Sequence, residues 1–112
     1  MKENKAYIKP HMLANVVMSL KDFHGLTGLT VSKVQGFGRI MVDARHRMVD
    51  DLVDYVPHVK IEIVCKDDLV DQIVAIIEKT AHTGLSGDGI IFVFNVEAAT
   101  RISTGERGES AL

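Results

Sequence analysis

The first apolar pattern along the chain is that of an amphipathic helix. Leu13, Val16, Val17 and Leu20 recur at helical spacing and form one apolar stripe. Pro10, just before them, suits the first turn of a helix. The glycines at positions 25 and 28 are typical of the stop that follows a helix. The pattern predicts a helix that begins near Pro10 and ends before Gly25.

A second helix is predicted after Asp67 and Asp68. These two acids stand where an N-cap residue and a first-turn carboxylate stabilise a helix start. The apolar residues that follow at helical spacing are Leu69, Val70, Ile73, Val74, Ile76 and Ile77.

Four segments have the character of strands. Residues 6–9 predict a short edge strand, and residues 27–35 (TGLTVSKVQ) are rich in β-formers. Val59, Ile61 and Ile63 alternate with Lys60 and Glu62, which is the period of a half-buried strand. Residues 90–96 (IIFVFNV) form a continuous apolar run, typical of a strand in the middle of a sheet.

The predicted order is β-α-β, a long gap, and β-α-β. Two such units predict an α+β, ferredoxin-like sandwich of four antiparallel strands with both helices on one face. Residues 1–112 fit one domain. The open face, rich in Val, Ile and Phe, is expected to pack against other subunits. The gap at residues 39–56 has a length typical of functional loops. The polar tail at residues 103–112 is expected to be mobile.

Composition excludes several classes of protein. The chain is 46% hydrophobic and 25% charged, as globular proteins are, and its net charge of −2 is unlike that of a nucleic-acid binder. No apolar run reaches the length needed for membrane insertion. The single cysteine, Cys65, excludes an intrachain disulfide and is interpreted as a small buried hydrophobe. We expect a soluble, cytoplasmic protein that is not an enzyme, since no catalytic constellation is visible.

Residues 80–94 (TAHTGLSGDGIIFVF) place three glycines around one carboxylate, Asp88, directly before the last strand. Such a loop can either bring backbone N–H groups to a phosphate or serve only as a turn. The Lys and Ser/Thr that complete a Walker A loop are missing. By itself, the motif favours the turn.

The segments YIKP, GLTVSKVQGFGR, PHVKIEIV, TAHTGLSGDGIIFVF and RISTGE follow one another at a spacing that resembles the PII signal-transduction proteins. The resemblance covers nearly the whole chain. It implies a homotrimer of ferredoxin-like subunits that binds nucleotides in the clefts between them. It also implies that residues 39–56 are the T-loop, the exposed segment through which these proteins bind their targets.

The same resemblance implies a set of nucleotide-binding residues. Those at the base of the T-loop are Gly36, Phe37, Gly38 and Arg39. Those of the glycine loop, called the B-loop in this family, are Gly87, Asp88 and Gly89. Those that would contact base, ribose and phosphates from the neighbouring subunit are Gly28, Leu29, Thr30, Glu62 and Arg101, and Val64 is included among the nucleotide-binding positions.

Departures from the family pattern change the expected ligand. Ile90 replaces the basic residue after the glycine loop, and Ser103 replaces a second arginine. Two cations that would face a triphosphate are absent, so ADP or AMP is favoured over ATP, with Mg²⁺ possible if ATP binds. Ile40 and His58 replace a glutamine and a lysine linked to 2-oxoglutarate, and Asp51 or Leu52 falls where the family's modified tyrosine stands. The usual response to 2-oxoglutarate and that modification are therefore expected to be lost.

The function predicted is that of a regulatory protein. Nucleotide binding would bias the T-loop, which would control a membrane transporter or metabolic enzyme in nitrogen regulation or a related transport process. One alternative is a metal-responsive relative linked to metal efflux, with His46 and Asp50 as weak candidate ligands, although a solvated loop is the simpler interpretation of these residues. The other alternative is a structural trimer with a vestigial cleft.

Overall fold

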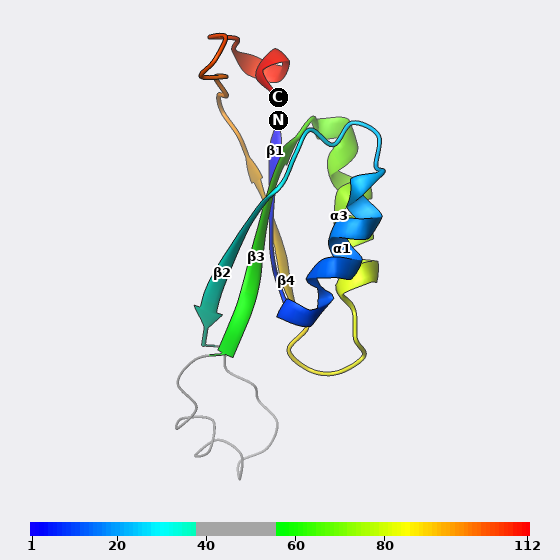
Figure 1. Ribbon diagram of the computed structural model, residues 1–112. Coiled ribbons are helices and arrows are strands. Elements are labelled where there is room, and N and C mark those ends of the chain that lie inside the picture. The colour runs from blue at the N-terminus through cyan, green and yellow to red at the C-terminus, as the bar shows by residue number, and fades with distance from the viewer. Residues whose placement is uncertain (38–55) are drawn as a thin grey trace.

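A computed structural model describes residues 1–37 and 56–112 of the chain (Figure 1). Its elements are β1 (Lys2–Ile8), the 3₁₀ turn η1 (Pro10–Met12), α1 (Leu13–Lys21), β2 (Thr30–Gly36), β3 (Val56–Cys65), the 3₁₀ turn η2 (Asp67–Leu69), α3 (Val70–Ala81), β4 (Gly89–Asn95) and the 3₁₀ turn η3 (Gly108–Ala111). The strands form one antiparallel sheet in the order β2-β3-β1-β4. Both helices cover the same face, which confirms the predicted ferredoxin-like fold (Figure 1).

The core lies between the helices and the sheet. From α1 it takes Val16 and Leu20, and α3 contributes Ile73 and Ile77, as the helical spacing predicted. The sheet contributes Ala6, Ile8, Val59, Ile61, Ile63 and Cys65, all nearly inaccessible to solvent. Burial of a large aliphatic side chain contributes roughly 1.5–3 kcal/mol, so this layer is the main source of stability.

The first strand differs from the prediction. A short edge strand was predicted at residues 6–9, whereas β1 spans Lys2–Ile8 and lies in the interior of the sheet, between β3 and β4. Its polar residues hid it, because Lys2, Glu3 and Lys5 are charged. The alternation nevertheless holds in the structure, since Asn4, Ala6 and Ile8 face the core.

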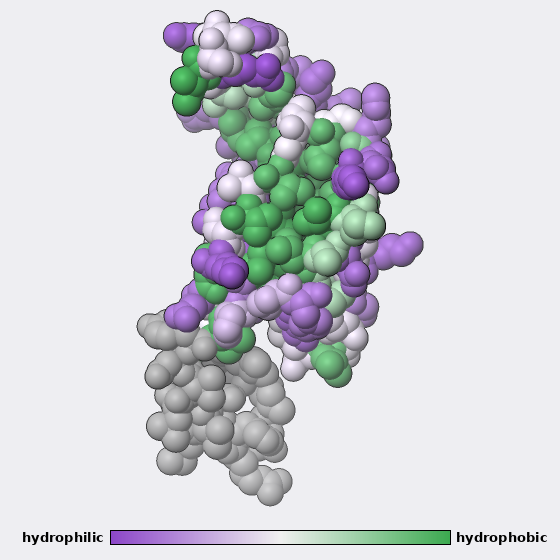
Figure 2. Space-filling model, viewed as in Figure 1, coloured by the Kyte–Doolittle hydropathy of each residue, from purple (hydrophilic) through white to green (hydrophobic). Residues whose placement is uncertain are grey.

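The last strand also differs from the prediction. The apolar run at residues 90–96 was expected in the middle of the sheet, yet β4 is an edge strand that, among the described strands, pairs only with β1. Ile90, Phe92 and Phe94 each remain 44–53% exposed. Figure 2 shows a separate gathering of apolar side chains on the visible face of the molecule, between the sheet and the helices. The continuous apolar run therefore reflects two apolar faces, one of them uncovered within a single chain.

Two further corrections concern a helix start and the C-terminal segment. Asp67 and Asp68 do not cap α3; they lie in η2, and an oxygen of Asp67 is 2.7 Å from the amino group of Met1. This contact lowers the pKa of Asp67. The segment predicted as a mobile tail is instead hydrogen-bonded, through a bridge between Thr100 and Arg107 and through η3. Among the described residues, neither helix has the length and apolar character required to cross a membrane.

Asn4 is a polar residue inside the core that the sequence pattern did not indicate. Its side chain is fully buried on the helix-facing side of β1. The amide nitrogen lies 3.5 Å from the carbonyl oxygen of Ile63 and 3.5 Å from the sulfur of Cys65, so both contacts are long. Its oxygen has no hydrogen-bond partner. A buried polar atom without a partner costs free energy, so Asn4 weakens the core locally.

We predict that Asn4→Val raises the free energy of unfolding by about 1 kcal/mol, because an apolar β-branched side chain replaces an unsatisfied amide. Urea denaturation at one fixed protomer concentration measures the change. Asn4→Asp is the matched control and should destabilise the fold by burying a charge. A less stable Asn4→Val protein would contradict this account of the Asn4 site.

Candidate functional site

A cavity of about 560 Å³ opens at the end of the sheet where β2 begins and β3 ends. Its lining consists of Glu3, Thr27, Gly28, Leu29, Thr30, Glu62, Val64 and Leu112. Five of these, Gly28, Leu29, Thr30, Glu62 and Val64, are nucleotide-binding positions implied by the family resemblance. Small-molecule sites commonly have volumes of about 300–1,000 Å³, so the cavity has a size that suits a ligand.

Strand register explains why these residues meet. Thr30 is the partner of Glu62 between β2 and β3, and Glu3 is the partner of Val64 between β1 and β3. Residues separated by some 30 to 60 positions in the sequence therefore lie side by side at one end of the sheet. The loop that carries Gly28 and Leu29 enters β2 at the same end.

Two carboxyl groups give the cavity its charge. Burial raises the pKa of Glu3, and the hydrogen bond between Glu3 and Glu62 raises it further. The same hydrogen bond lowers the pKa of Glu62, together with Lys60, whose amino nitrogen lies 3.3 Å from a Glu62 oxygen. Of the two carboxyl groups, Glu62 therefore ionises more readily, and it can accept hydrogen bonds from ligand hydroxyl or amino groups.

Arg101 lies at this same end of the molecule. Its Nε donates to the carbonyl oxygen of Ala111 at 3.2 Å, and its Nη2 donates to that of Leu112 at 2.8 Å. Leu112 in turn lines the cavity. The structure therefore brings the predicted Arg101 next to the cavity, with its guanidinium bound to the chain's own carbonyl groups.

The glycine loop lies at the opposite end of the sheet. Gly89 begins β4 with a φ of +114°, and a Cβ at this position would overlap the carbonyl oxygen of Tyr7. Gly89 is therefore required by the packing of β4 against β1, whatever the loop binds. Gly87, which is exposed, and Asp88, which is half-buried, precede it.

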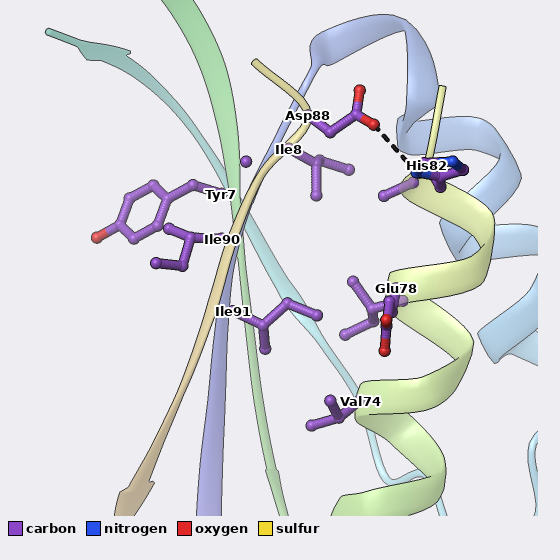
Figure 3. Close-up of a pocket in the computed structure, with 11 residues that line it drawn as sticks. Tyr7, Ile8, Val74, Glu78, His82, Asp88, Ile90 and Ile91 are labelled. Carbon is purple, nitrogen blue, oxygen red and sulfur yellow. Dashed lines mark ion pairs between the residues drawn. The ribbon is translucent and has the colours of Figure 1, made fainter. Parts of the chain in front are cut away.

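Asp88 holds this loop together from within. Its carboxylate accepts hydrogen bonds from the hydroxyl of Thr83 and, at 2.9 Å, from the backbone N–H of Thr83. The amino group of Lys9 lies 3.1 Å from one carboxylate oxygen, and Nδ1 of His82 lies 3.3 Å from the other (Figure 3). The Thr83 hydrogen bonds, followed by Lys9, hold the pKa of Asp88 well below its usual range. Asp88 thus acts on the loop's shape, a role that the sequence did not indicate.

Lys9, Thr83 and His82 are the residues that sequence reasoning missed. None of the three received a functional role from the sequence. A signal existed in part, because Asp and Thr in loops commonly bond to nearby backbone groups. No sequence signal indicated the contact between Lys9 and Asp88, since the two residues are distant in the sequence.

A pocket of about 340 Å³ lies beside this loop, between β4 and α3. Ile91 and Val74 face into it, whereas Tyr7 and Ile90 point to the other side of the sheet (Figure 3). Its walls are largely apolar, with Glu78, His82 and Asp88 at the polar margin. None of the predicted cavity residues from the other end of the sheet contributes to it.

The remaining predicted residues fall in a third place or outside the described ranges. Gly36 ends β2 opposite Val56, and Phe37 follows it with 62% of its surface exposed. Six residue steps separate Thr30 from Gly36, about 20 Å along a strand. Gly38, Arg39, His46 and Asp50 lie outside the described residues. Within residues 1–37 and 56–112, no three His, Cys, Asp or Glu side chains are grouped as metal ligands.

We predict that Asp88→Asn lowers the melting temperature at pH 7, because the loop loses its ionised acceptor. The folded pKa of Asp88 is depressed, so its contribution is complete above the ordinary value of 3.8 and is lost as pH falls below it. The difference in melting temperature between wild type and Asp88→Asn should therefore be smaller in acid. Thermal unfolding from pH 7 to pH 3 measures it, with Asp22→Asn, at an exposed position, as the matched control. Equal melting temperatures at pH 7 would refute this role.

The sequence was compared with known proteins. It matches the family described as Nitrogen regulatory protein P-II over residues 1–106. It is 47% identical to the Nitrogen regulatory protein P-II of Haemophilus influenzae (strain Rd) and 48% identical to that of Pasteurella multocida (strain Pm70). It is 47% identical to the Nitrogen regulatory protein P-II 1 of Escherichia coli (strain K12), and each alignment covers 100% of both chains. Together with the ferredoxin-like fold, these matches establish that the chain belongs to the nitrogen regulatory protein P-II family.

Proposed function

We propose that the chain is a cytoplasmic nitrogen regulatory protein that binds an adenine nucleotide and controls a target protein through its T-loop. The observation that carries the proposal is the cavity at the start of β2, which collects Gly28, Leu29, Thr30, Glu62 and Val64 beside Arg101. The relatives carry names of regulatory proteins rather than enzymes, in agreement with the expectation that this chain is not an enzyme.

A composite site between subunits accounts for the separation of the predicted residues. In one chain the cavity and Arg101 lie at one end of the sheet, whereas Gly36 and Gly87–Gly89 lie at the other end on opposite edges. About 20 Å of strand lies between the two ends, too far for one nucleotide phosphate chain to reach both regions. A second copy that presents its cavity to the first copy's glycine loop would complete the site.

The open face of the sheet supports the proposed homotrimer. Phe92 and Phe94 lie there beside Tyr7, with ring centroids 6.4 Å apart for Tyr7 and Phe92 and 6.3 Å apart for Phe92 and Phe94. Lys5 extends over the Phe94 ring at 5.1 Å. Aromatic residues exposed together in this way are typical of subunit interfaces, because burial of each ring removes a large apolar area from water.

ADP or AMP is the proposed ligand in preference to ATP. Ile90 and Ser103 stand where the family has cations, and both are exposed in the single chain. Arg101 is then the cation contributed by the described residues of the proposed site, and Arg39 is the predicted one at the T-loop base. Fewer cations reduce the attraction for a third phosphate more than for the first.

The proposed switch couples the nucleotide to the T-loop through the loop's base. Gly36 and Val56 form the last pair of the β2–β3 ladder, next to the T-loop. Nδ1 of His58 lies 3.1 Å from the carbonyl oxygen of Val56. A ligand that contacts Gly36 and Phe37 would bear on this last rung. Different ligands would then favour different arrangements of the loop, which binds a transporter or enzyme in one of them.

We predict that Gly28→Leu abolishes nucleotide binding without unfolding the protein. No atom lies within 4 Å of the position that a Cβ would take at Gly28, so the added side chain fills the cavity rather than clashing with the chain. Calorimetric titration with AMP, ADP and ATP measures binding, and thermal unfolding checks the fold. Asn15→Leu, on the exposed side of α1, is the matched control. Unchanged affinity in Gly28→Leu would exclude this cavity as the nucleotide site.

We also predict that the double variant Ile90→Lys with Ser103→Arg strengthens ATP binding about tenfold or more, because each cation adds a charge-assisted hydrogen bond to phosphate. AMP binding should change much less. The two dissociation constants are compared at constant ionic strength by calorimetry. An equal gain for AMP and ATP would mean that the new cations do not face the distal phosphates. If none of these proteins binds a nucleotide, the structural trimer with a vestigial cleft becomes the favoured function.

A further inference from the structure

The guanidinium of Arg101 is occupied by the chain itself. Two of its N–H groups donate to the carbonyl oxygens of Ala111 and Leu112, at 3.2 and 2.8 Å. An arginine that is available for phosphate presents its N–H groups to solvent or ligand, since each N–H bonds one acceptor well. In this structure two of the five N–H donors of the Arg101 guanidinium are bound to oxygens of the chain itself.

This arrangement rests on a folded turn rather than on a loose chain end. Arg101 and Glu106 are joined by a backbone hydrogen bond of 2.9 Å, and the N–H of Gly108 donates to the carbonyl of Ala99 at 2.9 Å. The hydroxyl of Ser110 donates to the carbonyl of Arg107 at 2.9 Å, and Leu112 closes η3 through Glu109. Residues 108–112 are thereby directed back toward Arg101.

Leu112 also reaches the cavity at the start of β2. It lines that cavity together with Gly28 and Glu62, and it lines a second cavity of about 500 Å³ beside Cys65 and Leu69. Residues 108–112 therefore touch two separate parts of the proposed site, the guanidinium of Arg101 and the cavity at the start of β2. The oxygens of Ala111 and Leu112 accept hydrogen bonds from Arg101, the cation proposed to bind phosphate. The side chain of Leu112 lies at the wall of the cavity at the start of β2.

We propose that residues 108–112 compete with the nucleotide for Arg101 and for the cavity at the start of β2, an inference that rests on the proposed function. The carbonyl group of Ala111 is a neutral acceptor, whereas a phosphate group presents several charged oxygens and can form the stronger set of hydrogen bonds with a guanidinium. A bound nucleotide displaces the segment from Arg101 and moves Leu112 away from the cavity wall. The observed dissociation constant is then the intrinsic dissociation constant divided by the fraction of molecules in which the segment is released.

The test uses full-length variants that release the segment and keep Arg101. Gly108 has a φ of +73°, and no atom lies within 4 Å of the position that a Cβ would take there, so Gly108→Val strains the turn without touching the cavity. Leu112→Ser removes the apolar contact and leaves the turn's sequence otherwise intact. Each should strengthen ADP binding about three- to tenfold in calorimetric titration. In Gly108→Val the two modest hydrogen bonds to Arg101 no longer compete, and in Leu112→Ser the apolar contact at the cavity wall is lost.

Arg101→Ala supplies the control. If the segment competes through Arg101, Gly108→Val in the Arg101→Ala background should give no further gain in ADP affinity. If wild type, Gly108→Val and Leu112→Ser bind ADP equally, the competition is refuted and the nucleotide site stands. If none of the three binds ADP at millimolar concentration, the proposed function and the competition both fail.

Discussion

β1 is held by two neighbouring strands at once, and the positions of the other elements depend on that double pairing. Each of its seven residues has a partner on β3 and another on β4. Ala6 lies between Ile61 and Ile91, and Asn4 lies between Ile63 and Val93. A slip of one residue would turn Ala6 and Ile8 out of the core, so the buried layer under the helices enforces the register.

The same register positions both parts of the candidate site. At one end it sets Glu3 beside Val64 and Thr30 beside Glu62, which forms the cavity. At the other end it brings the start of β4 so close to Tyr7 that only glycine fits at position 89. Because the strands keep these ends apart, a single subunit holds two halves of the proposed site that do not meet.

Two charged residues that the family resemblance assigned to the ligand already form hydrogen bonds within the chain. The carboxylate of Asp88 is bound by Thr83, Lys9 and His82, and the guanidinium of Arg101 is bound by the turn at residues 108–112. The two contacts differ in character. Asp88 is held by several groups from separate parts of the chain, which makes it part of the loop's architecture. Arg101 is held by oxygens of one short segment, which a phosphate group can replace.

The sequence by itself determined the two helices, the strand at Val59–Ile63, the fold class and the family, because helical and strand periodicities and linear motifs are local properties of a chain. Tertiary structure alone decided that β1 is interior, that β4 is an edge, that Asn4 is buried, and that residues 103–112 fold back on Arg101. Each of these depends on contacts between residues far apart in the sequence. Lys9 and Asp88 illustrate the reason: no local pattern links them, and only the antiparallel packing of β1 against β4 brings their charges within 3.1 Å.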